Sequence, residues 1–80
     1  MALHWFHPTV YIKDPQPGMT AGISNAEGAA EALLTFTKRG AKWRAAVNLA
    51  MAVISDEEEP NGLSRVFEAA AKAEGILRQR

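Results

Sequence analysis

Residues 6–13, FHPTVYIK, carry the pattern that indicates the fold class most clearly. Every second residue of this stretch is apolar: Phe6, Pro8, Val10 and Ile12. Alternation of β-branched and aromatic residues with period two predicts a strand that is buried on one side only. The residues between them, Tyr11 included, are expected to face outward. Because Pro8 has no N–H group for a ladder hydrogen bond, we expect it at the start of the strand or on a sheet edge.

A second short strand is expected at residues 19–23, where apolar residues alternate with Thr20 and Gly22. The intervening residues 14–18, DPQPG, consist largely of turn formers. Together the two strands predict a β-hairpin, in which Gly22 either weakens the second strand or marks a bulge.

A first helix is expected to begin at Ser24 and to end at Arg39 and Gly40. Ser24 and Glu27 have the spacing of a capping box, in which each side chain accepts from a backbone N–H of the other residue. Gly40 suits the left-handed position that ends many helices.

The second helix is predicted over residues 42–55, which carry a clear apolar stripe. Further alanines and Leu49 make this helix apolar on almost every side, so it lies centrally in the fold or at a partner interface. The acidic residues 56–59 oppose the negative end of its dipole and favour the start of the next helix.

A third helix follows the turn at residues 60–62, and Gly75 is predicted to end it in a left-handed conformation. Residues 77–80 are expected to fray. The predicted order is ββααα, a β-hairpin followed by three α-helices. This makes residues 1–80 a single small domain of the α+β class, with its ordered core at residues 6–77.

Charge and composition exclude several function classes. Nine Lys and Arg residues balance nine Asp and Glu residues, which disfavours a uniformly basic nucleic-acid or membrane binder. Without cysteine there is no disulfide, thiolate zinc site or cysteine nucleophile, which fits a reducing compartment. The first residues lack the pattern of a signal peptide, and no apolar run is long enough to span a membrane. We therefore expect a cytoplasmic protein that does not bind membranes.

Four segments, taken in order, resemble a known family: residues 8–10 (PTV), 26–34 (AEGAAEALL), 39–47 (RGAKWRAAV) and 65–76 (RVFEAAAKAEGI). Over residues 6–76 the chain resembles domain-of-unknown-function family 982, small proteins found mostly in alphaproteobacteria. Because the family has no established activity, the resemblance implies a fold and a size but no site residues. The chain departs from the family pattern where Phe36 and Thr37 replace a frequent Trp-Pro pair and where Ala50 replaces a frequent cysteine.

Signals for catalysis or metal binding are weak. On a helix, the spacing of His4 and His7 would let both rings bind one metal ion. This segment is expected to be extended, which places the two rings on opposite faces. The acidic residues 56–59 lack the alternating ligand register of a calcium loop. No nucleophile motif is present, so we expect a protein that is not an enzyme, with no catalytic residues, no metal and no cofactor.

The most concentrated cluster of charged side chains outside the acidic residues 56–59 is basic. Lys38, Arg39, Lys42 and Arg44 fall within seven positions around Trp43. Such a corner could contact an anion or the phosphates of a nucleic acid. The alternative interpretation is a solvated corner that complements the carboxyl end of the first helix, with Trp43 belonging to the core.

A homodimer is expected on two grounds. A lone hairpin leaves strand edges unpaired, which strand addition between two copies would relieve. The second helix is basic where it begins and acidic where it ends, so two helices packed antiparallel would pair these ends. The aromatic residues Trp5, Phe6 and Tyr11 are the candidate partner interface. We therefore expect a non-enzymatic protein-interaction or regulatory module that acts as a homodimer. The alternative is a nucleic-acid-associated protein that uses the basic corner.

Overall fold

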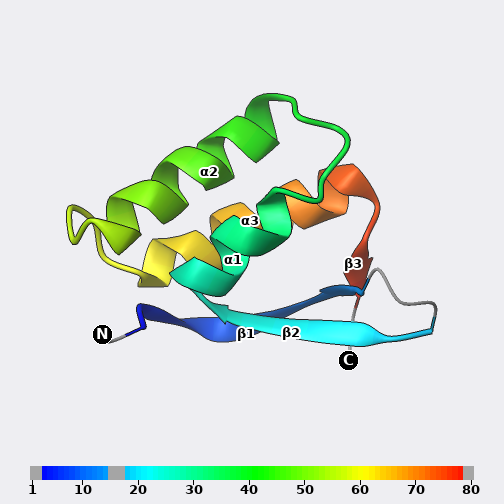
Figure 1. Cartoon of the computed structure of the whole chain (residues 1–80), viewed down its shortest axis with the longest axis horizontal. Helices are drawn as coiled ribbons and strands as arrows, with labels where there is room; N and C mark the ends of the chain where they lie inside the picture. The colour runs from blue at the N-terminus through cyan, green and yellow to red at the C-terminus, as the bar shows by residue number, and fades with distance from the viewer. Residues whose placement is uncertain (1–2, 15–17, 79–80) are drawn as a thin grey trace.

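A computed structural model describes residues 3–14 and 18–78. It confirms the α+β class: one antiparallel sheet carries three helices on one of its faces (Figure 1). The elements are β1 (Trp5–Lys13), β2 (Thr20–Asn25), α1 (Ala26–Leu33), α2 (Ala41–Ile54), α3 (Asn61–Glu74) and β3 (Leu77–Arg78).

The sheet has the strand order β2-β1-β3, so β1 is its central strand. Tyr11 pairs with Gly22 on one side and with Arg78 on the other. Residues 77–80 were expected to fray, but Leu77 and Arg78 form the short strand β3, so the expectation is wrong for these two residues. Residues 79–80 lie outside the described part of the chain. The turn at Gly75 returns the chain to β1, where the Lys13 N–H donates to the Ile76 carbonyl over 2.8 Å.

The predicted burial of β1 is confirmed for Phe6, Val10 and Ile12 and wrong for Pro8, which is exposed. The pairing of β1 with β2 is irregular between Trp5 and Val10, and β3 reaches only the far end of β1. Pro8 therefore lies where its missing N–H interrupts no ladder. Its carbonyl accepts from the Ser64 hydroxyl of α3 over 2.6 Å.

The start of α1 differs from the predicted capping box. Asn25 is the N-cap, because its Oδ1 accepts from the Gly28 N–H over 2.6 Å. Ser24 still belongs to β2, and Glu27 bonds to His4 instead of to the cap. An asparagine next to the serine supplies an equally good cap oxygen one residue later.

The end of α1 also differs: the helix stops at Leu33 and not at Arg39. Side chains satisfy the carbonyls that follow, since Arg39 donates to Phe36 over 3.1 Å and to Leu34 over 2.9 Å. Gly40 has a φ of −85° and precedes α2, so its predicted left-handed role is wrong. Capping by a side chain of the following loop replaces the glycine stop.

The stops of α2 and α3 are confirmed. Gly75 is left-handed, with a φ of 84°, and the Ile76 N–H donates to the Ala71 carbonyl over 3.1 Å. Asp56 adopts the same left-handed conformation after the end of α2, with a φ of 62°. Both ends have the hydrogen bonds of a Schellman motif.

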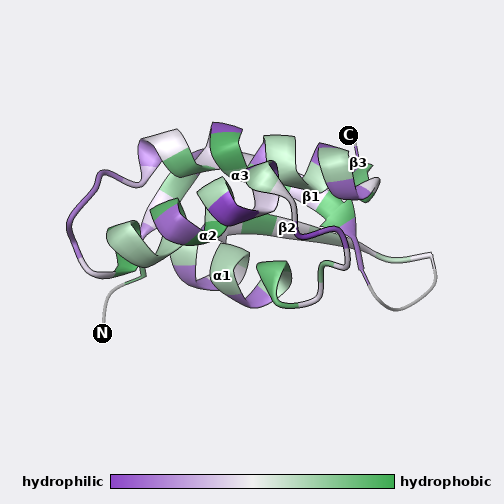
Figure 2. Cartoon of the chain, turned by 90° about the horizontal axis from the view of Figure 1, so that it is seen from above, coloured by the Kyte–Doolittle hydropathy of each residue, from purple (hydrophilic) through white to green (hydrophobic). Residues whose placement is uncertain are grey.

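The core fills the space between the sheet and the helices. Phe6, Leu33, Val53, Leu63 and Phe67 are its largest fully buried side chains. Phe36 joins them, with its ring centroid 6.2 Å from that of Phe67. The loop that follows α2 is strongly hydrophilic (Figure 2). In the described part of the chain, no helix has the length and apolar character needed to cross a membrane.

Candidate functional site

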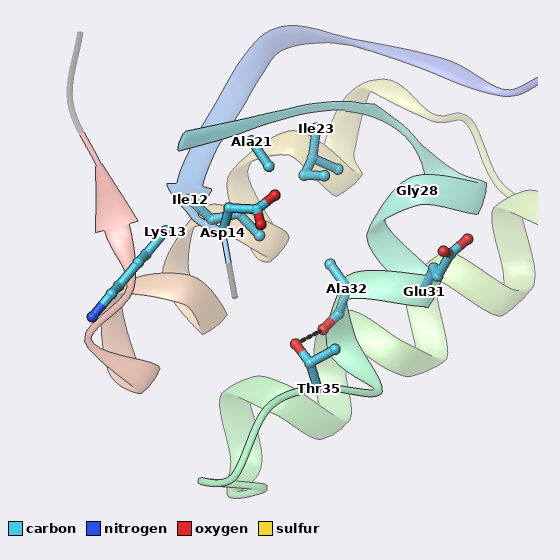
Figure 3. A pocket seen from close by; sticks show the side chains of 9 residues that line it. All are labelled: Ile12, Lys13, Asp14, Ala21, Ile23, Gly28, Glu31, Ala32 and Thr35. Carbon is cyan, nitrogen blue, oxygen red and sulfur yellow. Dashed lines mark hydrogen bonds between the residues drawn. The ribbon is translucent and has the colours of Figure 1, made fainter. Parts of the chain in front are cut away.

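A cleft of about 290 Å³ lies between β2 and α1 (Figure 3). Ala21 and Ile23 point from β2 into the space between the strand and the helix, and Ala32 of α1 lies opposite. The Thr35 hydroxyl donates to the Ala32 carbonyl over 2.7 Å and closes one end of this wall. The floor of the cleft is therefore apolar.

Two carboxylates line the same cleft. Asp14 follows β1, and its carboxylate lies beside Ala21 and Ile23 in the close-up view (Figure 3). Glu31 is an exposed residue of α1, while the amine of Lys13 points away from the other labelled side chains. The carboxylate of Glu31 points away from Asp14 in this view, so the two acids do not converge on one point (Figure 3).

The cleft lies beside an open strand edge. Asp14 donates its N–H to the Met19 carbonyl over 3.0 Å, which sets the alternation of ladder bonds between β1 and β2. By that alternation the backbone N–H and C=O groups of Thr20 and Gly22 point away from β1. Among residues 3–14 and 18–78 no strand pairs with this side of β2.

A second hollow, about 430 Å³, lies between α1 and α2. We call it the α1–α2 groove; it is lined by Ala30, Glu31, Leu34, Arg39, Trp43, Val47 and Met51. The side chains of Leu34 and Met51 remain 70% and 54% exposed. Two large apolar residues beside one hollow indicate an interaction surface more strongly than a single exposed apolar residue does. Single apolar residues scattered over a protein surface are normal.

The structure brings the four predicted basic residues to one corner, where all are exposed. The guanidinium of Arg39 is engaged there, because it bonds to two carbonyls of the α1 end and stacks 4.9 Å from the Trp43 ring. Trp43 is half-buried and donates its indole N–H to the Leu33 carbonyl over 2.8 Å. Its core role is therefore supported.

Glu74 of α3 holds the loop that carries this corner. Its carboxylate accepts from the N–H groups of Thr37 and Lys38 over 2.9 and 2.8 Å. These backbone hydrogen bonds lower the pKa of Glu74 below its ordinary value, since they favour its ionised form.

His4 forms a cluster that sequence reasoning missed. Its Nδ1 lies 2.6 Å from Glu27 Oε2, and its Nε2 lies 2.8 Å from Asp56 Oδ1. The hydrogen bonds to Glu27 and then to Asp56 raise the pKa of His4. Burial alone would raise the pKa of Glu27, but the hydrogen bonds from His4 lower it. His7, by contrast, is exposed near α3.

The three aromatic residues predicted as a partner interface do not share one environment. Phe6 is fully buried, so its part in that interface is corrected: the strand alternation turns it into the core. Trp5 is 55% exposed. Tyr11 is half-buried, and its ring lies over Gly22, where an added Cβ would come within 3.2 Å of it.

The residues of the α1–α2 groove were not predicted as a site. The sequence signal for this groove is the apolar character of α2 on almost every side, which is typical of an interface helix as well as of a central one.

In residues 3–14 and 18–78, no group of three or more His, Asp or Glu side chains could hold a metal ion. No family model, curated protein or solved structure matches the chain. The resemblance to family 982 therefore stays a prediction.

Proposed function

We propose that the protein is a non-enzymatic protein-interaction module that acts as a homodimer, with the α1–α2 groove as the contact between two copies. The observation that carries this proposal is the exposure of Leu34 and Met51 on one apolar hollow. Removing such surface from water is the main favourable term in protein association.

Charge supports a second copy of this chain as the occupant. Lys42 and Arg44 are exposed where α2 begins, and residues 56–59 are exposed and acidic where it ends. Two α2 helices that lie antiparallel would place each basic end beside the partner's acidic end. This arrangement also brings Met51 of each copy over the other copy's groove.

The location of the contact is tested with single substitutions of exposed residues. We expect Leu34→Gln and Met51→Gln each to raise the dimer dissociation constant about tenfold, which corresponds to ~1.4 kcal/mol. Met19→Gln is the matched control, because Met19 is also 54% exposed but lies outside the groove. Sedimentation equilibrium measures the constant, and circular dichroism checks that each variant is folded. Equal effects of the three substitutions would contradict the proposed contact.

Nucleic-acid binding at the basic corner stays the alternative. It predicts salt-sensitive binding that Lys38→Gln combined with Lys42→Gln abolishes. The proposed function predicts that the wild type and this double variant both copurify with little nucleic acid. The ratio of absorbance at two ultraviolet wavelengths measures the nucleic-acid content of each preparation.

A further inference from the structure

The edge of β2 that faces away from β1 lies beside the apolar cleft. We propose that β2 pairs antiparallel with β2 of a second copy of this chain, so that two three-stranded sheets join into one. This contact is separate from the α1–α2 groove, so the inference does not depend on the proposed function.

The backbone of β2 fits a second copy of itself in one register. Thr20, Gly22 and Ser24 alternate with residues that bond to β1, so their N–H and C=O groups point outward. When Gly22 lies opposite Gly22 of the second copy, Thr20 lies opposite Ser24 of that copy, and the reverse. In all three pairs the outward groups then face one another, so the ladder of hydrogen bonds continues across the contact.

The side chains of β2 fit the same register. It places Ala21 opposite Ile23 of the second copy, on the face of the sheet that carries the helices. Ala21 and Ile23 are only half-buried in the single chain, and both line the cleft beside α1 (Figure 3). Each copy therefore covers apolar surface of the other, and the removal of this surface from water favours the pair.

Charge does not keep a second copy away from this edge. β2 has the sequence TAGISN, which contains no charged residue and no proline, two features that often protect strand edges. Nine Lys and Arg residues balance nine Asp and Glu residues over the whole chain, so two copies approach without net repulsion. A strand that is unprotected and complementary to itself favours its own copy as the occupant of the edge.

Amide hydrogen exchange of the full chain tests the pairing. A dissociation constant of about 1 mM would pair about half of the chains at ~1 mM protein and slow exchange of the Thr20, Gly22 and Ser24 amides about twofold relative to tens of micromolar. The amides of Ala21 and Ile23 already bond to β1 and are expected to change little. This alternation distinguishes strand pairing from a contact that covers one face of the sheet.

The same measurement on Met51→Gln separates the two contacts. Met51 lines the α1–α2 groove and does not line the cleft beside β2. We expect the same slowing of the three β2 amides in this variant, whether or not the groove joins two copies. Failure of the groove contact therefore leaves the result for the β2 edge unchanged.

Two double substitutions test the register. Thr20→Glu combined with Ser24→Glu sets like charges opposite each other twice in the pair, so we expect the dissociation constant to rise about tenfold and the slowing to disappear. Thr20→Glu combined with Ser24→Lys sets opposite charges in the same places and is expected to keep the slowing. Both variants place the same acid beside Lys13 of their own chain, and circular dichroism checks that both are folded. Exchange of the three amides that does not depend on protein concentration, or equal slowing in the two double variants, would overturn the proposal.

Discussion

The Nε2 atom of His4 lies 2.8 Å from Oδ1 of Asp56, a residue 52 positions further along the chain. The other ring nitrogen lies 2.6 Å from Oε2 of Glu27. When the imidazole is protonated, each of its two ring nitrogens carries a proton and can donate to the carboxylate beside it. One side chain thus joins the segment before β1 to the start of α1 and to the loop that ends α2.

This bridge makes the free energy of unfolding depend on pH. The pKa of His4 is raised from 6.5, so its contribution is fully present below that value and is lost as pH rises through the folded-state pKa. We expect urea unfolding from about pH 5 to about pH 9 to show a stability loss for the wild type that His4→Ala lacks. His7→Ala, at an exposed histidine, is the control and should follow the wild type. A pH-independent gap between wild type and His4→Ala would contradict the bridge.

Glu74 predicts the opposite pH dependence at the acidic end. Its pKa lies below 4.5, so its contribution is present above that value and is lost as pH falls through the folded-state pKa. We expect Glu74→Gln to speed amide exchange of Thr37 and Lys38 near neutral pH and to flatten the acid unfolding curve. Glu68→Gln removes an exposed acid from the same helix and should leave both measurements unchanged.

The indole N–H of Trp43 ties the start of α2 to the end of α1. Trp43→Phe keeps most of the ring and removes the donor, so we expect a loss of about 1 kcal/mol in the free energy of unfolding. Trp5→Phe changes an exposed indole and should stay within about 0.5 kcal/mol of the wild type. Chemical denaturation of both variants checks the difference, and equal losses would refute the structural role of the indole N–H.

Gly75 requires a backbone conformation that other residues rarely adopt. Because its φ is 84°, Gly75→Ala is expected to destabilise the protein by about 1–2 kcal/mol. Gly62 lies in the first turn of α3 with open space around it, so Gly62→Ala should be neutral or stabilise by up to about 1 kcal/mol. Thermal unfolding distinguishes the two, and a loss from both substitutions would contradict this account.

The predictable parts of the fold have their signals close together in sequence. Gly75 marks the end of α3 one residue past the helix, and the acids after Ser55 mark the end of α2. The alternation in β1 predicts the burial of Phe6, Val10 and Ile12, whereas Pro8 departs from it because the pairing with β2 is interrupted there.

The parts of the structure that were not predicted depend on side-chain contacts between elements or on segments too short to show a pattern. The end of α1 is set by Arg39 and Trp43, which reach back from the following loop and helix. β3 has two residues, too few to show a period. The His4 cluster joins residues 23 and 52 positions apart, and the α1–α2 groove depends on how two helices pack. Local pattern carries no information on such pairs.

The proposed association of two copies of this chain is tested by its mass in solution. Sedimentation equilibrium of the wild-type chain at tens of micromolar is predicted to give about twice the chain mass of 8.7 kDa, with a value that falls on dilution and in Met51→Gln. A mass of 8.7 kDa that does not change with concentration would contradict the account.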